Sequence, residues 1–157
     1  MEVISMGQRQ RTEPTTSQLL TLIRNADTFE DATQYHRTAQ EPLFQEVLYK
    51  WMQQSKLNAK DMIERTGIER SYFYHILSGK KNPGKNMVLR IGLCLKLTLN
   101  EMNHLLRVAG FSDLYSRRRR DAALIFAIVN HYTMEQTNDL LIKAEEDPLY
   151  WDDKHGK

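Results

Sequence analysis

Two short helical segments separated by a brief turn constrain the fold of this chain more than any other feature. In the segment NAKDMIERTG, Asn58 is a favourable N-cap and Gly67 a favourable stop, which predicts a helix over residues 59–65. Residues 70–78 are a second predicted helix. Because only about four residues join them, the two helices must meet at a steep angle, as in a helix-turn-helix.

The rest of the chain shows helical periodicity and no alternating strand pattern. The helix predicted to open at Pro42 carries an apolar stripe at i, i+3, i+4, i+7 and i+8: Phe44, Val47, Leu48, Trp51 and Met52. Further helices are predicted over residues 18–25, 88–95 and 98–109, whereas 25–40 is ambiguous and helical at most from Phe29 onward. The sequence therefore predicts an all-α fold.

Composition limits the class of protein. Of 157 residues, 41% are hydrophobic and 27% are charged, which is typical of a globular domain with a small appendage. The chain has no apolar run as long as a membrane span and no signal-peptide pattern. The single cysteine, Cys94, excludes an internal disulfide and is expected in the core. We therefore expect a cytoplasmic protein without membrane contact.

Charge is distributed unevenly along the chain. The formal net charge is only +2, but residues 69–120 contain 11 Lys and Arg against 3 Asp and Glu. The following 37 residues, 121–157, contain 3 against 8. A basic middle segment is typical of nucleic-acid binders, and a solvated charged face explains the charge alone equally well.

An internal repeat with an offset of 35 residues occupies the C-terminal half. TLNEMNHLLRVAGFSDLY, residues 98–115, aligns without gaps on TMEQTNDLLIKAEEDPLY, residues 133–150. Both copies open with a capping box, Thr98 with Glu101 and Thr133 with Gln136. Shared amphipathic periodicity could produce such similarity by chance, but matching Asn and Tyr positions favour a duplicated helix pair.

These patterns predict a domain organisation. Residues 1–41 form an N-terminal arm with a short helix, residues 42–112 form a helix-turn-helix domain, and residues 113–152 form a C-terminal helical appendage for dimerisation or sensing. Residues 153–157 are a tail. The expected fold is thus all-α, with a helix-turn-helix domain followed by a repeated two-helix unit.

The segment LNAKDMIERTGIERSYFYHILSGKKNP resembles the lambda-repressor-like (Xre/Cro-type) family of DNA-binding domains, over roughly residues 43–106. The downstream part is similar to bacterial regulators that add an RDA helix and an N-x-L-L helix, here residues 120–122 and 138–141. The resemblance implies a sequence-specific DNA-binding transcriptional regulator that binds double-stranded DNA as a homodimer. Four aromatic residues are candidates for dimer packing or for capping their own core: Trp51, Tyr115, Tyr150 and Trp151.

The second helix has an inner and an outer face. Ile68, Phe73, Ile76 and Leu77 are spaced to face inward with Met62 and Ile63. The resemblance implies that Arg70, Ser71 and His75 contact base edges in the major groove, and a guanine-binding arginine contributes roughly 1–3 kcal/mol of discrimination. Other residues are expected to contact the DNA backbone or to flank the base contacts: Tyr72, Tyr74, Lys80, Lys81, Lys85, Arg117, Arg118, Arg119 and Arg120.

Three departures from the family favour an alternative. Ala59 stands where the family often has a glutamine, and Glu69 stands at the N-cap in place of Ser or Thr. Leu77 replaces a residue that is commonly polar. The alternative is a protein-interaction adaptor, antitoxin-like or kinase-associated, that uses Tyr72, Tyr74 and His75 as an aromatic contact patch.

The sequence contains no pattern typical of an enzyme. The five histidines lack metal-ligand spacing, and neither a Gly-rich phosphate loop nor a nucleophile elbow occurs. We therefore expect no catalytic activity, no cofactor and no metal.

Overall fold

The computed structural model describes residues 15–33 and 42–151, and the chain divides into two compact units, residues 1–41 and 42–157. The described residues form helices and connecting turns without any strand, which confirms the predicted all-α class. Of the expected N-terminal arm with its short helix, residues 1–41, the structure describes residues 15–33, and the expected tail, residues 153–157, lies outside the described residues.

The first unit contains two short helices. α1, Thr16–Arg24, begins with a capping box in which Gln18 and Thr15 exchange side-chain-to-backbone hydrogen bonds of 2.8 and 3.2 Å. α2 spans Phe29–Ala32. Neither helix has a buried residue, and the apolar side chains of Leu20, Leu22 and Ile23 in α1 are exposed.

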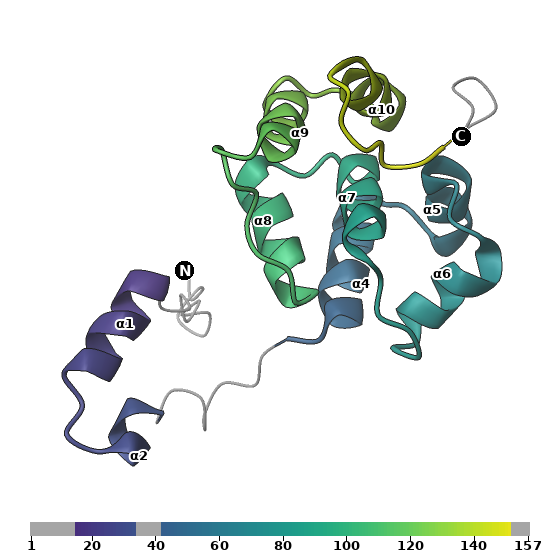
Figure 1. The fold of residues 1–157 in the computed structure, drawn as a ribbon. Coiled ribbons are helices and arrows are strands. Elements are labelled where there is room, and N and C mark those ends of the chain that lie inside the picture. The colour runs from purple at the N-terminus through teal and green to yellow at the C-terminus, as the bar shows by residue number, and fades with distance from the viewer. Residues whose placement is uncertain (1–14, 34–41, 152–157) are drawn as a thin grey trace, which may run out of the picture. The chain divides into compact units, whose positions relative to one another are not determined.

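The second unit contains the remaining described helices, and Figure 1 shows their arrangement. Their bounds are α4 Phe44–Ser55, α5 Ala59–Thr66, α6 Arg70–Leu77, α7 Lys85–Cys94, α8 Leu99–Val108, α9 Arg119–Val129 and α10 Met134–Lys143. α7 packs against α5, α8 and α10 and therefore lies in the middle of the unit. α6 packs against α4 and α5, whereas α9 packs against α8 and α10.

α4 begins two residues later than the sequence suggests. Pro42 was expected to open the helix, but the first helical residue is Phe44 and Leu43 is the N-cap. The Leu43 backbone N–H donates to a Glu46 carboxylate oxygen at 3.3 Å. This local hydrogen bond supplies the N-terminal cap that Leu43 itself lacks, and it fixes the start of the helix.

One hydrophobic core extends through the second unit from α4 to the segment after α10. Its largest fully buried side chains come from every helix of this unit, α9 and α10 included: Leu48, Met62, Phe73, Ile76, Val88, Leu89, Ile91, Met102, Leu105, Leu106, Leu124 and Leu141. The two C-terminal helices therefore share the core of the preceding helices instead of forming a core of their own.

The helix pairs α7–α8 and α9–α10 have equivalent local contacts. Thr98 and Thr133 are the N-caps of α8 and α10, each within a capping box. The side-chain oxygen of Asn103 accepts from the Leu114 N–H at 3.0 Å, and that of Asn138 accepts from the Leu149 N–H at 2.8 Å. In each pair an asparagine on the second helix thus holds the segment that follows it.

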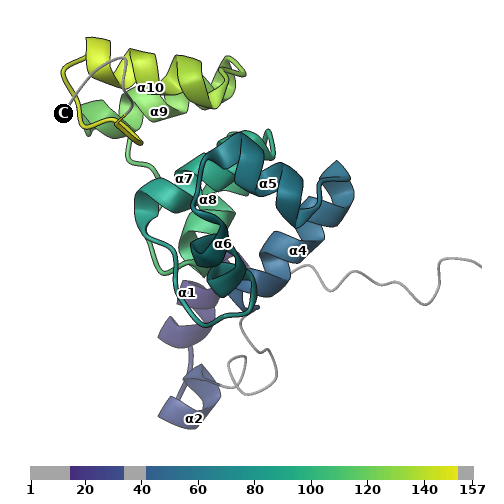
Figure 2. The same cartoon turned by 90° about the vertical axis from the view of Figure 1, so that its right-hand side faces the viewer.

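α6 and the C-terminal helices lie at different ends of the second unit. In Figure 1 and in Figure 2, which is turned by 90°, α6 lies well below α9 and α10. No described helix is long and apolar enough to span a membrane.

Candidate nucleic-acid interface

The connection between α5 and α6 is short and held by local hydrogen bonds. α5 ends at Thr66, whose hydroxyl donates to the Met62 carbonyl at 2.6 Å and accepts from the Ile68 N–H at 3.2 Å. Gly67 follows with a left-handed φ of 68°, where a side chain would strain the backbone. Ile68 is buried and anchors the turn. These contacts therefore fix the orientation of α6 relative to α5.

The inner face of α6 is the one that its apolar spacing predicts. Phe73, Ile76 and Leu77 are buried, and Ile68 in the turn is buried with them. Ile63, which was also expected to face inward, is partly buried against the same core. These contacts fix the orientation of α6, so its opposite face points to solvent.

The outer face of α6 holds the predicted base-contacting residues. Arg70 and Ser71 are exposed, and Tyr74 is 44% exposed. Tyr72 and His75 are half-buried. The structure therefore brings Arg70, Ser71 and Tyr74 together on the open face, with His75 less accessible.

Each tyrosine of α6 lies beside a cationic side chain. The Arg70 guanidinium lies 5.5 Å from the centroid of the Tyr74 ring. The Lys81 ammonium lies 5.4 Å from the centroid of the Tyr72 ring. Such contacts contribute roughly 0.5–1 kcal/mol at exposed sites and restrict the cation to one region of the surface. The tyrosines thus hold two of the basic side chains on the outer face.

Sequence reasoning missed both of these cation–π contacts, although one had a local signal. Arg70 and Tyr74 are four residues apart on one helix, and side chains at that spacing are neighbours. The contact between Tyr72 and Lys81 has no such signal, because it depends on how the turn after α6 folds back. That turn is closed by the Lys81 N–H, which donates to the His75 carbonyl at 3.1 Å.

Glu69 is the N-cap of α6. Its carboxylate accepts from the Ser71 N–H at 3.1 Å and from the Tyr72 N–H at 3.0 Å. Hydrogen bonding by the Ser71 backbone, then by the Tyr72 backbone, lowers the pKa of the Glu69 carboxyl, with smaller contributions from the Ser71 hydroxyl and the charge of His75. The acidic residue thus satisfies two N–H groups at the helix start and stays ionised near neutral pH.

The predicted lysines differ in their surroundings. Lys80 and Lys81 follow α6 and are exposed. Lys85 is half-buried, and its ammonium lies 3.5 Å from a carboxylate oxygen of buried Asp121. The other carboxylate oxygen of Asp121 accepts from the Tyr115 N–H at 2.9 Å. Lys85 therefore ties α7 to α9, whereas Lys80 and Lys81 remain on the surface beside α6.

The arginine run at the start of α9 divides in a similar way. Arg117, Arg118 and Arg119 are exposed, and Arg119 lies 3.9 Å from a Glu146 carboxylate oxygen. Arg120 is half-buried and donates to the Asp147 carbonyl at 2.8 Å and to the Asn86 side-chain oxygen at 2.7 Å. Because α9 lies at the other end of the unit from α6 (Figures 1 and 2), this run and α6 belong to different parts of the surface.

Comparison of the chain with known protein families, with characterised proteins and with solved structures gave no match. Within residues 15–33 and 42–151, no group of three or more His, Cys, Asp or Glu side chains is placed to hold a metal ion. The surface around α6 is therefore interpreted from its own geometry.

Proposed function

We propose that residues 42–112 form a helix-turn-helix domain of the lambda-repressor-like type, and that α6 enters the major groove of double-stranded DNA. One observation carries this proposal. α6 buries Phe73, Ile76 and Leu77 and exposes Arg70, and the exposed Lys81 lies in the turn that follows the helix. A short helix that is fixed on one side, with exposed cations on it and after it, fits the groove of a duplex, whose edges carry phosphates.

In this proposal the α6 residues recognise bases. Arg70 binds a guanine through its O6 and N7 atoms, a pairing that contributes roughly 1–3 kcal/mol of discrimination. Ser71 adds a weaker hydrogen bond near the start of the helix, and half-buried His75 adds a further contact to a base. The guanidinium of Arg70 lies 5.5 Å from the centroid of the Tyr74 ring, and this contact preorganises Arg70 for base binding.

The phosphate contacts come mainly from the turn after α6. Lys80 and Lys81 are exposed there, and Tyr72 holds Lys81 at 5.4 Å from its ring centroid. Such contacts fix register and add salt dependence without sequence preference. Lys85 and Arg120 contribute less in this proposal, because both are engaged within the protein. DNA bound to α6 would have to extend toward α9 to contact Arg117, Arg118 and Arg119.

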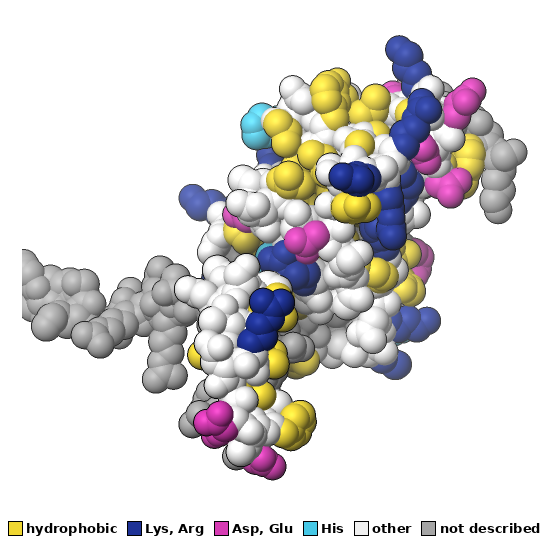
Figure 3. Space-filling view, turned by 60° about the vertical axis from the view of Figure 1, so that its left-hand side comes forward, with side chains coloured by type: hydrophobic (Ala, Val, Ile, Leu, Met, Phe, Trp, Pro, Cys, Tyr) yellow, Lys and Arg dark blue, Asp and Glu magenta, His cyan; other side chains and the backbone are white. Residues whose placement is uncertain are grey.

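We propose further that the protein is a cytoplasmic transcriptional regulator that acts as a homodimer, with α9 and α10 as a duplicated helix pair. Single helix-turn-helix domains generally pair so that two helices meet successive turns of DNA. Tyr115, Phe126 and Val129 are each about half exposed, at 52%, 50% and 57%. Figure 3 shows hydrophobic side chains gathered over the upper part of the second unit, with Lys and Arg side chains beside them. Exposed apolar side chains of this unit are our candidates for the dimer contact, and sedimentation equilibrium measures whether the protein pairs.

A protein-interaction adaptor is the second candidate, and a specific observation favours it. Tyr74 is 44% exposed and Tyr72, two residues before it on the same helix, is partly exposed, and aromatic side chains of this kind are enriched at protein interfaces. The ionised Glu69 beside them would repel a nearby phosphate but would not hinder a protein partner.

Selection of bound sequences from a random duplex pool separates the two candidates. The DNA-binding proposal expects one enriched motif, a two-fold symmetric one if the protein pairs, and an affinity that falls steeply with salt. If no duplex is retained at low salt while the protein remains folded, DNA binding is excluded and the adaptor proposal replaces it.

A further inference from the structure

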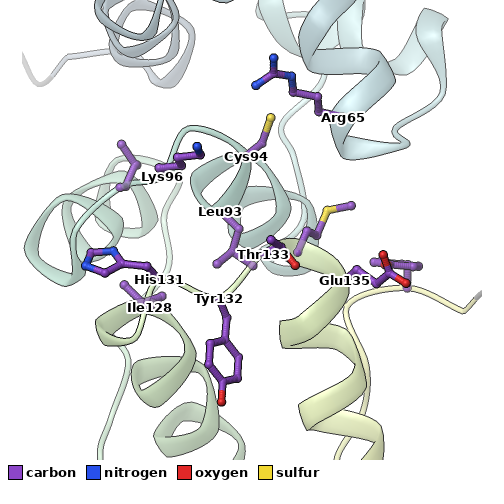
Figure 4. A pocket seen from close by; sticks show the side chains of 12 residues that line it. Arg65, Leu93, Cys94, Lys96, Ile128, His131, Tyr132, Thr133 and Glu135 are labelled. Atoms are coloured by element: carbon purple, nitrogen blue, oxygen red, sulfur yellow. The ribbon is translucent and has the colours of Figure 1, made fainter.

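A pocket opens between the end of α7, the turn from α9 to α10 and the last turn of α5. Its volume is about 750 Å³, within the roughly 300–1,000 Å³ typical of small-molecule sites. Figure 4 shows the lining side chains, which come from helices far apart in the sequence. A molecule bound here would contact both the helices around α7 and the C-terminal helix pair.

The buried side chains that line the pocket are apolar. Leu93, Leu97 and Ile128 line it and are buried, and Met134 and Tyr150 add partly buried apolar surface. No charged residue lies among these five. This part of the pocket therefore fits the hydrocarbon or aromatic body of a ligand.

The exposed lining of the pocket carries more cations than anions. Arg65 and Lys96 are exposed cations there, Glu135 is the acidic lining residue, and His131 is also exposed. Figure 4 shows Arg65 and Lys96 on one side of the pocket with Cys94 between them, and Glu135 on the other side. Among the described residues, neither Arg65 nor Lys96 forms an ion pair. Two cationic groups thus flank one side of the opening.

The 35-residue offset of the sequence relates several lining residues. The related pairs are Leu93 with Ile128, Lys96 with His131, and Leu97 with Tyr132. Lys96 and His131 also share a left-handed backbone, with φ of 56° and 57°. Each helix pair thus contributes a basic and two apolar side chains from equivalent turns, so the pocket lies where the two pairs face each other.

Cys94 does not make the pocket a reactive site. Burial raises the pKa of its thiol, while the nearby Arg65 and Lys96 cations lower it by less. The thiol also lies 3.8 Å from the Met62 sulfur. A protonated, partly buried thiol is a poor nucleophile, so the chemistry at this edge is electrostatic.

We propose that this pocket binds a small organic anion, with its apolar body against Leu93, Leu97 and Ile128 and its anionic group between Arg65 and Lys96. Hydrogen bonds to a carboxylate or sulfonate are charge-assisted and orient the ligand, while the apolar wall supplies most of the affinity. The site is separate from the α6 face, and its occupancy can be measured without DNA.

The probe for this site is anilinonaphthalene sulfonate, compared with uncharged phenylnaphthylamine, which has the same rings without the sulfonate. Fluorescence titration of the full chain is expected to give saturable binding of one sulfonate probe per chain. The double variant Arg65→Gln with Lys96→Gln should weaken it about tenfold or more, the loss expected for a charge-assisted contact. The affinity for the uncharged probe should stay unchanged.

Lys56→Gln is the matched control, because Lys56 also has a left-handed φ of 56° at a helix end but does not line the pocket. Thermal melting establishes that each variant is folded. The salt dependence of probe binding to the wild type gives a second measurement. Salt should weaken the binding of the sulfonate probe and leave the binding of the uncharged probe unchanged. The proposal is overturned if the sulfonate probe shows no saturable binding, or if it binds the folded double variant as well as the wild type.

Discussion

The guanidinium of Arg90 in α7 donates to the backbone carbonyl of Thr66 at the end of α5, from Nε at 3.1 Å and from Nη2 at 2.6 Å. The same guanidinium lies 5.2 Å from the centroid of the Tyr150 ring. Burial lowers the pKa of Arg90, although an arginine stays charged at any physiological pH. One side chain thus joins the helix before α6, the central helix α7 and the segment after α10.

Replacing Arg90 should destabilise the second unit. Arg90→Met removes the charge-assisted hydrogen bonds to Thr66 but retains an apolar stem, and we expect a loss of about 1.5–3 kcal/mol in the free energy of unfolding. Arg107→Met is the control, since Arg107 pairs with exposed Asp113 at 2.7 Å and such pairs contribute about 1 kcal/mol or less. Urea unfolding measures both. Equal losses for the two variants would contradict the role given to Arg90.

Gly79, directly after α6, should not tolerate a side chain. Its φ is 79°, and an added Cβ would lie 2.5 Å from the Gln45 side-chain nitrogen. The Gln45 side chain can move, so the left-handed backbone decides the cost, and Gly79→Ala should lose roughly 1–2 kcal/mol of stability. Gly84→Ala, with φ of −72° and open space around it, should have a smaller effect. Full recovery of stability in Gly79→Ala by Gln45→Ala would show that the contact, and not the backbone, carries the cost.

Glu69 should make stability depend on pH in the acidic range. Its pKa is lower in the folded protein than in the unfolded chain, because backbone N–H groups of Ser71 and Tyr72 hydrogen-bond its carboxylate. Its contribution is therefore fully present above the unfolded pKa and is lost as pH falls through the folded pKa. The wild type should melt above Glu69→Gln at neutral pH, and the difference should shrink below about pH 4. A difference in melting temperature that stays constant down to pH 3 would refute this assignment.

The role of Tyr74 can be tested by separating the contribution of its ring from that of its hydroxyl. If the Tyr74 ring holds Arg70 for DNA binding, Tyr74→Phe should retain wild-type affinity and Tyr74→Leu should lose roughly two- to fivefold, the equivalent of an exposed cation–π contact. Fluorescence anisotropy with a selected duplex measures both. If Tyr74→Phe loses as much affinity as Tyr74→Leu, the hydroxyl is the functional group, as in a hydrogen bond to phosphate.

Local patterns in the sequence predicted the helices and the buried face of α6 well. Phe73, Ile76 and Leu77 are spaced so that a helix must place them on one side, and all of them are buried. The N-caps Asn58, Thr98 and Thr133 could be predicted equally well, because all residues of a capping box lie within four positions of the sequence. Such features require no knowledge of tertiary structure.

Contacts between distant segments could not be predicted. Arg120 was expected to contact phosphate, but it bonds Asp147 and Asn86, which are 27 and 34 residues away. Lys85 pairs with Asp121 in the same way, and Arg90 reaches Thr66 across 24 residues. The sequence does not show whether a charged residue faces solvent or pairs with a buried partner. Only the packing of α7 against its neighbours distinguishes these two situations.

The most direct test of the account is the affinity for a selected duplex against a shuffled duplex, measured for wild type, Arg70→Ala and Lys81→Ala at equal salt. We predict that Arg70→Ala loses most of the preference for the selected duplex, by the roughly 1–3 kcal/mol of a guanine contact. Lys81→Ala should weaken both duplexes alike and reduce the salt dependence. Equal weakening of both duplexes by Arg70→Ala, or no duplex binding by the folded wild type, would contradict DNA recognition through α6.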